Sequence, residues 1–281
     1  MKKVIALAFF VGALPFFNCA SAHAQETEEP KSASLLDDYH QKVGFTYGAQ
    51  AVVQSTYIWR GLCSGAFNIQ PSANVGYGGL FVEWWWNIGV EEWTFSTFQP
   101  EMDITVGFAR WGLNVSMLYV HNFNCGLFDG NNYAGRGNRL QLTGSYTISS
   151  KLPLRFLWST RVAASDGYIN KNGETAFAWS SYAEISYTQK LPYDMKLYGA
   201  VGISPWRSCY TGYRDGWGVT NIDLRLQKDW SLSEHCGLKL MGQVTINPFL
   251  IAADRSSVVW HPDYPDNQSI NANIGLGVYL K

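Results

Sequence analysis

The chain has 281 residues, of which 15% are aromatic and only 15% are charged, below the roughly 25% charged residues of an average soluble domain. Its formal net charge is −1, and this balance predicts no nucleic-acid partner. Beyond the N-terminal segment no run of about 18 apolar residues occurs, which excludes a membrane-spanning helix.

The first residues are typical of a secretory signal peptide. Lys2 and Lys3 form a basic start, residues 4–17 are apolar, and Ala22-His23-Ala24 supplies the small residues of a cleavage site. We expect residues 1–24 to be removed after export. Losing two of the 21 basic residues would leave 19 against 22 acidic residues.

Two alternatives concern the segment around this cleavage site. Cys19 could carry a lipid, but Phe16-Phe17-Asn18 before it is too bulky and polar for the cleavage context of a lipoprotein. Residues 25–42 are mostly polar and predict a flexible periplasmic N-terminal segment, which could also partly plug the interior of the domain that follows.

From residue 43 to residue 281 the dominant pattern has a period of two. In the first segment the apolar positions are Phe45, Tyr47, Ala49, Ala51, Val53, Tyr57 and Trp59, and Thr46, Gln50, Gln54, Thr56 and Arg60 fall between them. The later segments repeat the pattern with Phe67, Ile69, Val75, Tyr77; Leu80, Val82, Trp84, Trp86; Met102, Ile104, Val106, Phe108; Leu113, Val115, Met117, Tyr119; Leu140, Leu142, Tyr146; Phe156, Trp158, Val162; Phe177, Trp179, Ile185, Tyr187; Leu197, Val201, Ile203; Thr220, Ile222, Leu224, Leu226; Leu238, Leu240, Val244; and Ile270, Ile274, Leu276, Leu280.

This pattern predicts a single all-β domain, an antiparallel transmembrane β-barrel of about 12 strands. Each segment is close to the roughly 9–11 residues that a tilted membrane strand needs. In lipid every backbone donor and acceptor must pair within the protein, which only a closed barrel achieves with strands. The alternative is a soluble β-sandwich with a hidden apolar face. The Trp and Tyr residues near segment ends favour the barrel, because aromatic girdles lie at membrane interfaces.

The connections between segments alternate in length. Short joins occur at Gly78-Gly79, Arg110-Trp111, Ser149 to Leu152, Leu191 to Asp194 and Ser231 to Gly237. The longer, polar joins are residues 61–66, 89–99, 122–137, 164–175, 204–218 and 248–269. This alternation predicts short periplasmic turns and long external loops, with both termini in the periplasm.

The polar positions of the strands would line the lumen. We expect the lumen-lining and selectivity residues to be Arg60, Glu83, Asp103, Arg139, Arg155, Arg161, Glu184, Asp223 and Arg225. They could form a rigid filling of ion pairs, or a narrow channel that slightly repels cations where Arg155, Arg161 and Arg225 gather. Phe81, Trp85 and Tyr198 on the same face could stack a sugar or nucleoside, or simply fill space.

The cysteines and histidines predict no metal site and no cofactor. Cys63, Cys125 and Cys209 fall in long joins and Cys236 in a short one on the opposite side, so one cysteine is left over from any bridge among the first three. His121, on the lipid-facing set, and His261 lie near the external rim, where outer-membrane lipid hydrolases place a histidine. No serine in a nucleophile context accompanies either one, so we do not expect an enzyme.

The opening strands resemble the TorF-type porin family. The resemblance covers about the first three strands and is carried by Ser55-Thr56-Tyr57-Ile58-Trp59-Arg60-Gly61, by Gln70-Pro71 and by the hairpin at Gly78-Gly79. The chain departs from that family at Leu62-Cys63 and Gly65-Ala66, where more polar residues are expected. The resemblance implies a small outer-membrane barrel and a generic porin function, and it transfers no binding residue.

The predicted function is therefore a narrow channel in the outer membrane of a Gram-negative cell that passes small hydrophilic solutes. A structural or surface-binding barrel with a closed lumen is the alternative. The expected partners are outer-membrane lipids and lipopolysaccharide, and the barrel-assembly machinery during biogenesis. The last strand alternates as the assembly signal of such barrels does, although it ends in Tyr279-Leu280-Lys281 instead of an aromatic residue.

Overall fold

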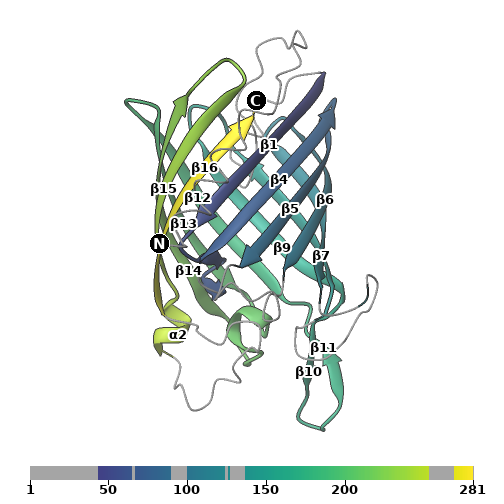
Figure 1. The fold of residues 1–281 in the computed structure, drawn as a ribbon. Helices are drawn as coiled ribbons and strands as arrows, with labels where there is room; N and C mark the ends of the chain where they lie inside the picture. Colours follow the sequence, from purple (N-terminus) through teal and green to yellow (C-terminus); the bar gives the residue numbers. More distant parts are fainter. Residues whose placement is uncertain are drawn as a thin grey trace, which may run out of the picture.

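The structure, a computed structural model, describes residues 44–64, 67–89, 100–123, 126, 137–252 and 269–280. Twelve antiparallel strands close a barrel in the order β1-β16-β15-β14-β13-β12-β9-β8-β7-β6-β5-β4 (Figure 1). The strands are β1 (Phe45–Gln54), β4 (Asn68–Tyr77), β5 (Leu80–Gly89), β6 (Glu101–Arg110), β7 (Leu113–Asn122), β8 (Arg139–Thr147), β9 (Leu154–Ala164), β12 (Ser181–Leu191), β13 (Met195–Ser204), β14 (Gly218–Ser231), β15 (Cys236–Ile246) and β16 (Ile270–Leu280). The predicted fold class is confirmed. The expected signal peptide (1–24) and N-terminal segment (25–42) lie outside the described residues.

The remaining elements lie in the long connections. They are two short hairpins, β2 (Tyr57–Trp59) with β3 (Leu62–Ser64) and β10 (Gly167–Ile169) with β11 (Thr175–Phe177), the 3-10 turn η3 (Cys209–Thr211) and helix α2 (Pro248–Ala252). Figure 1 shows β10, β11 and α2 at one end of the barrel and the short turns at the other. Within the described ranges, no helix has the length and apolar character needed to cross a bilayer.

Two of the short turns are built from left-handed backbone. Gly78 and Gly79 join β4 to β5 with φ of 61° and 99°. Trp111 and Gly112, with φ of 57° and 79°, join β6 to β7, one residue later than the predicted join at Arg110-Trp111. Positive φ at both central residues is the type I′ geometry, whose twist matches that of the flanking strands. These turns therefore hold neighbouring strands in tight register.

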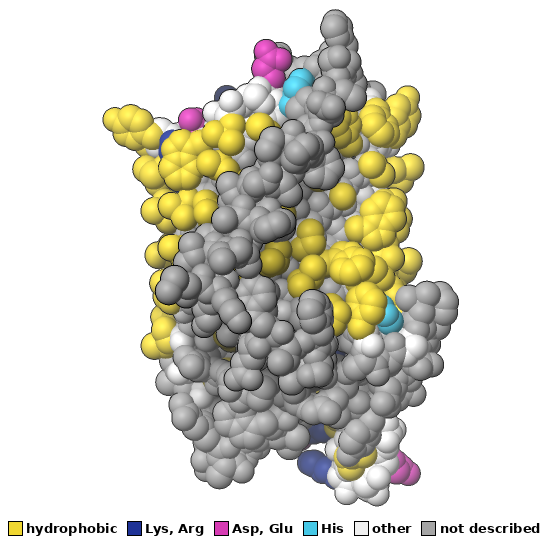
Figure 2. All heavy atoms as spheres, in the orientation of Figure 1, with side chains coloured by type: hydrophobic (Ala, Val, Ile, Leu, Met, Phe, Trp, Pro, Cys, Tyr) yellow, Lys and Arg dark blue, Asp and Glu magenta, His cyan; other side chains and the backbone are white. Residues whose placement is uncertain are grey.

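The outer face of the barrel is apolar, as the alternation predicts. Phe45, Leu80 and Ile274 are 65%, 64% and 61% exposed, and Trp84 and Val106 are exposed beside them. Figure 2 shows apolar side chains over the flanks of the barrel, wherever described residues are visible. The inner face carries buried polar side chains instead, including Gln50, Ser116, Thr143 and Asn273. This distribution is the reverse of that in a soluble sandwich, so the sandwich alternative is wrong.

Several positions assigned to the apolar outer set lie elsewhere. Val162 is an extra residue in a β-bulge, because Leu140 pairs with Ala163 and Gln141 with Arg161. Thr220 is likewise the extra residue of a bulge, between β13 and β14, and it is fully buried. A bulge places two residues opposite one and so reverses the alternation beyond it.

Four aromatic positions were also assigned to barrel strands that are shorter than expected, since β1 ends at Gln54 and β12 begins only at Ser181. Tyr57 and Trp59 belong to β2, inside the barrel, because β1 ends at Gln54. Phe177 ends β11, and Trp179 follows it in a loop with a φ of 53°. Period-two alternation continued through these segments, although they are not part of the barrel wall.

Candidate functional site in the barrel interior

The barrel encloses a cavity of ≈ 340 Å³. Seven of the nine predicted site residues line it: Arg60, Glu83, Asp103, Arg155, Glu184, Asp223 and Arg225. Trp85 and Tyr198, two of the three predicted inner aromatics, line it as well. Phe81 packs over Gly107, where a β-carbon would lie 2.7 Å from its ring, so it fills space. Arg139 and Arg161 are 3% and 0% exposed and do not line the cavity.

Opposite charges face one another across the lumen. Glu83 on β5 and Asp103 on β6 lie on one wall. Going around the barrel, β5 and β6 are six strands away from β13 and β14, which is half the circumference. Arg225 lies on β14 and Lys239 on the neighbouring β15. A solute in this cavity therefore meets Glu83 and Asp103 on one side, and Arg225 and Lys239 together with Asp223 on the other.

Much of the inner charge is paired within the wall. Arg139 Nη2 lies 2.6 Å from Glu101 Oε2, and Arg225 Nη2 lies 3.2 Å from Asp223 Oδ2. The hydroxyls of Tyr182 and Tyr198 donate to the two oxygens of Glu184 at 2.6 and 2.8 Å. These pairs fit the expected rigid filling, because Arg139–Glu101 joins β8 to β6 and Tyr198–Glu184 joins β13 to β12, whereas the other two contacts fix side chains within one strand.

Asp223 is held most fully. Its Oδ1 accepts from Gln243 Nε2 at 2.9 Å and from the Thr245 hydroxyl at 3.0 Å, in addition to the Arg225 contact of Oδ2. Asp103 differs, since its Oδ1 is buried and has no hydrogen-bond partner among the described residues. The carboxylates of Asp103 and Asp223 are therefore satisfied to different degrees.

The β2–β3 hairpin crosses the lumen instead of continuing the wall. It leaves the barrel wall between β1 and β4 and enters the interior. There the Tyr57 hydroxyl donates to Glu101 on β6 at 3.5 Å. At its tip, Arg60 Nη1 donates to Gln141 on β8 at 3.3 Å. The Arg60 guanidinium also lies over Tyr182 of β12, the strand diametrically opposite β4. The hairpin therefore narrows the lumen near the loop end.

The tip of this hairpin is enclosed by aromatic rings. The Arg60 guanidinium lies 4.7 Å from the ring centroids of Trp59 and Tyr182 and 5.7 Å from that of Tyr210, and it donates to the Tyr210 hydroxyl at 2.7 Å. Cation–π contact within about 6 Å is attractive. We call Arg60 with these three residues the arginine cage.

Gly61 completes the turn next to Arg60. Arg60 and Gly61 have φ of 52° and 81°, and a β-carbon at Gly61 would lie 1.8 Å from the Thr220 carbonyl oxygen. The Gly61 carbonyl in turn accepts from Asn247 Nδ2 at 3.1 Å. Only glycine fits this close approach of the hairpin to β14.

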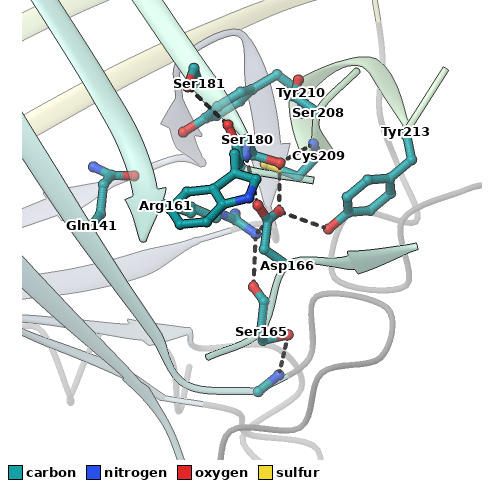
Figure 3. A network of polar contacts seen from close by, with 12 residues as sticks. Gln141, Arg161, Ser165, Asp166, Ser180, Ser181, Ser208, Cys209, Tyr210 and Tyr213 are labelled. Atoms are coloured by element: carbon teal, nitrogen blue, oxygen red, sulfur yellow. Dashed lines mark hydrogen bonds and ion pairs between the residues drawn. The ribbon is translucent and has the colours of Figure 1, made fainter. Parts of the chain in front are cut away.

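A second polar network holds the long loops at one end of the barrel together (Figure 3). Arg161 on β9 and Asp166 just after it are both fully buried, with Nη1 and Oδ1 3.8 Å apart. Asp166 accepts from the Ser180 backbone N–H at 2.6 Å and from the Tyr213 hydroxyl at 3.3 Å. Ser180 Oγ accepts from the Cys209 N–H at 2.8 Å. Two long connections, from β9 to β12 and from β13 to β14, are thereby joined. The sequence pattern missed Asp166, Ser180 and Tyr213, because alternation carries no information about loops.

Burial changes the acidity of several groups in this network. It raises the pKa of the Asp166 carboxyl, although Arg161 and the hydrogen bonds from Ser180 and Tyr213 act in the opposite direction. Burial also raises the pKa of the Cys209 thiol, which lowers its reactivity. No disulfide joins Cys63, Cys209 or Cys236 to one another, so the structure has no bridge between Cys63 and Cys209. Cys125 lies outside the described residues.

Within the part of the chain that the structure describes, the histidines do not form a recognisable hydrolytic site. His121 was expected on the lipid-facing surface, but it is 6% exposed and covered by neighbours that include Phe123, 4.6 Å away between ring centroids. Its Nδ1 lies 2.9 Å from Asn138 Oδ1, an amide and not a nucleophile. His261 lies outside the described residues. Within the described ranges, no group of three or more His, Cys, Asp or Glu residues is placed to hold a metal ion.

Comparison with known proteins gives only distant structural likeness. No protein-family model and no curated protein matches the chain. The NanC porin is 12% identical, with a TM-score of 0.43, 84% of this chain covered and 100% of that chain. An outer membrane channel from Pseudomonas putida F1 is 8% identical, with a TM-score of 0.43 and coverage of 90% and 99%. The P. putida toluene transporter TodX is 8% identical, with a TM-score of 0.38 and coverage of 85% and 90%.

Proposed function

We propose that the protein is an outer-membrane barrel that acts as a narrow porin-like channel for small hydrophilic solutes. The observation that carries the proposal is a charged cavity inside a closed barrel whose outer face is apolar. An apolar outer face suits the acyl chains of outer-membrane lipids and lipopolysaccharide, and a polar lumen suits water and dissolved solutes. Insertion of the barrel would depend on the assembly machinery.

The β2–β3 hairpin makes this a narrow channel. Because it crosses the lumen and is held at its tip by the arginine cage, solutes must pass beside it. Fixed charges at a constriction set which ions pass. The nine predicted residues are proposed to act together in this selection, with Arg139 and Arg161 contributing through the groups they hold and not by contact with solute.

The channel is tested by reconstituting the protein in planar lipid bilayers and measuring single-channel conductance. We expect small, uniform steps for the wild type. Arg60→Ala should increase the conductance, because it removes the guanidinium that ties the hairpin to Tyr182 and Tyr210. Lys171→Ala, at an exposed turn of the β10–β11 hairpin, is the matched loss of one cation and should leave conductance unchanged. Silence of both the wild type and Arg60→Ala would contradict the proposal.

A closed structural or surface-binding barrel is the second candidate. It is favoured by the same hairpin and by the buried network that ties the loops together at that end of the barrel. A silent wild type with a conducting Arg60→Ala variant would support this candidate over the open channel.

The hydrolase alternative predicts lipid hydrolysis that is lost in His121→Ala. We propose that the protein is not an enzyme, and we expect no hydrolysis by the wild type, because His121 contacts an amide instead of a hydroxyl nucleophile.

A further inference from the structure

One corner of the lumenal cavity combines carboxylates with aromatic rings. We define this acidic corner as Tyr57, Glu83, Trp85 and Asp103, all of which line the cavity. Glu83 and Trp85 lie on β5, and Asp103 lies on the adjacent strand β6, directly opposite Trp85 in the sheet. Tyr57 approaches from β2, with its ring centroid 5.3 Å from that of Trp85. Three separate elements therefore bring two acids and two rings to one place.

The carboxylate of Asp103 has unused capacity to accept hydrogen bonds. Its neighbour on the same strand face, Glu101, is paired with Arg139 at 2.6 Å. Asp103 Oδ1, by contrast, is buried and has no hydrogen-bond partner among the described residues. A ligand that donates hydrogen bonds and carries positive charge would satisfy this oxygen.

A second acceptor of the cavity is also unsatisfied. Asn221 is 5% exposed and lines the cavity, and its Nδ2 donates to the Tyr182 hydroxyl at 2.9 Å. Its Oδ1 has no hydrogen-bond partner in the described part of the chain. Asn221 lies on β14, across the lumen from the acidic corner, and Arg225 Nε on the same strand is a donor without a hydrogen-bond partner among the described residues. Asp103 offers a carboxylate and Asn221 only a neutral amide, so a cationic group is attracted more strongly to the acidic corner than to Asn221.

We infer that the acidic corner binds small organic cations that carry an ammonium or guanidinium group. Such a group forms charge-assisted hydrogen bonds with carboxylates and is attracted to the faces of aromatic rings. A hydrated potassium ion gains less from those rings, so the site should discriminate between the two. The inference rests on the proposed function, since it names the solute class that the channel would hold. A cavity of ≈ 340 Å³ has room for a molecule of this size.

The test is calorimetric titration of methylguanidinium chloride into the purified barrel in detergent, which measures binding without requiring conduction. We expect saturable binding that potassium chloride at the same ionic strength does not reproduce and that sodium acetate does not show. Asp103→Asn should weaken binding about tenfold or more, because the neutral amide cannot form an ion pair. Trp85→Leu should weaken it as well.

Asp229→Asn is the matched control. It removes one carboxylate from β14 that is paired with Lys196 at 3.5 Å and does not line the cavity, so it should leave methylguanidinium binding unchanged. If Asp103→Asn fails to give a β-rich circular dichroism spectrum, Glu83→Gln makes the same test at the neighbouring acid. Equal weakening by Asp229→Asn would show only a response to net charge and would overturn the site.

The two proposals fail in different ways. Conducting channels without methylguanidinium binding, or with binding that Asp103→Asn and Glu83→Gln leave unchanged, would overturn the cation site alone. Saturable binding to a barrel that is silent in bilayers would support the cation site and overturn the channel.

Discussion

Asp166 and Arg161 face each other with both side chains fully buried among the long loops at one end of the barrel. Burial raises the pKa of Asp166 above its ordinary value of 3.8. The folded state therefore keeps a proton over a pH range in which the unfolded chain has lost it. Stability from this group is present at low pH and falls as the pH rises through the raised pKa. We expect Asp166→Asn to remove this part of the pH dependence, seen as a flatter plot of unfolding midpoint against pH in detergent.

Asp166→Asn should also lower stability near neutral pH by about 3 kcal/mol, since the buried Arg161 guanidinium loses its counter-charge. Asp215→Asn is the control, because Asp215 is fully exposed and a hydrogen bond from Arg207 lowers its pKa. Any contribution of Asp215 has the opposite sign and is lost as the pH falls. Parallel pH profiles for the wild type and Asp166→Asn would show that the buried carboxyl does not titrate as described.

At the level of elements, the β2–β3 hairpin depends on the close contact of its tip with β14. Gly61→Ala would place a β-carbon 1.8 Å from the Thr220 carbonyl oxygen, so the tip must move away from β14. We expect a larger conductance in bilayers together with a loss of stability. Gly173→Ala is a matched control with almost the same φ, +80° against +81°, and no atom within 4 Å of the new β-carbon.

Gly173→Ala should lower the free energy of unfolding only through backbone strain, by about 1 kcal/mol, and should leave the conductance unchanged. If both variants behave alike in stability and conductance, the contact between Gly61 and β14 has no role in holding the hairpin.

The hairpin also shows which elements the sequence could predict. Strands with two different environments on their two faces, such as β4 and β5, were placed correctly because lipid and lumen impose opposite polarity on neighbouring residues. Tyr57 and Trp59 continue the same alternation inside the barrel, where neither face of the hairpin meets lipid. The bulged residues Val162 and Thr220 escaped prediction, since one inserted residue leaves no mark on composition.

For the whole molecule, the sequence predicted a closed barrel and most of the cavity lining but not how the interior is filled. Glu83, Asp103 and Arg225 were assigned to the lumen because they fall between apolar neighbours on their strands. The arginine cage and the Arg161–Asp166 network could not be predicted, because both join residues through loops whose course is set by tertiary packing. In the arginine cage, Tyr182 and Tyr210 lie about 120 and 150 residues beyond Arg60, and no local sequence pattern can encode contacts over such a separation.

The contrast between the two faces of the barrel can be measured on β6 alone. Val106 is 48% exposed on the outer face, whereas its neighbour Thr105 lines the cavity. Val106→Arg should destabilise the protein in lipid vesicles by about 2–4 kcal/mol, because an arginine near the bilayer midplane loses its hydration. Thr105→Arg adds the same charge one residue away and should destabilise the protein less. Residue 105 pairs with Glu83 of β5, so the new guanidinium can reach that carboxylate. Equal unfolding midpoints for the two variants in vesicles would mean that residues 105 and 106 meet the same solvent, contrary to a barrel that separates lipid from lumen.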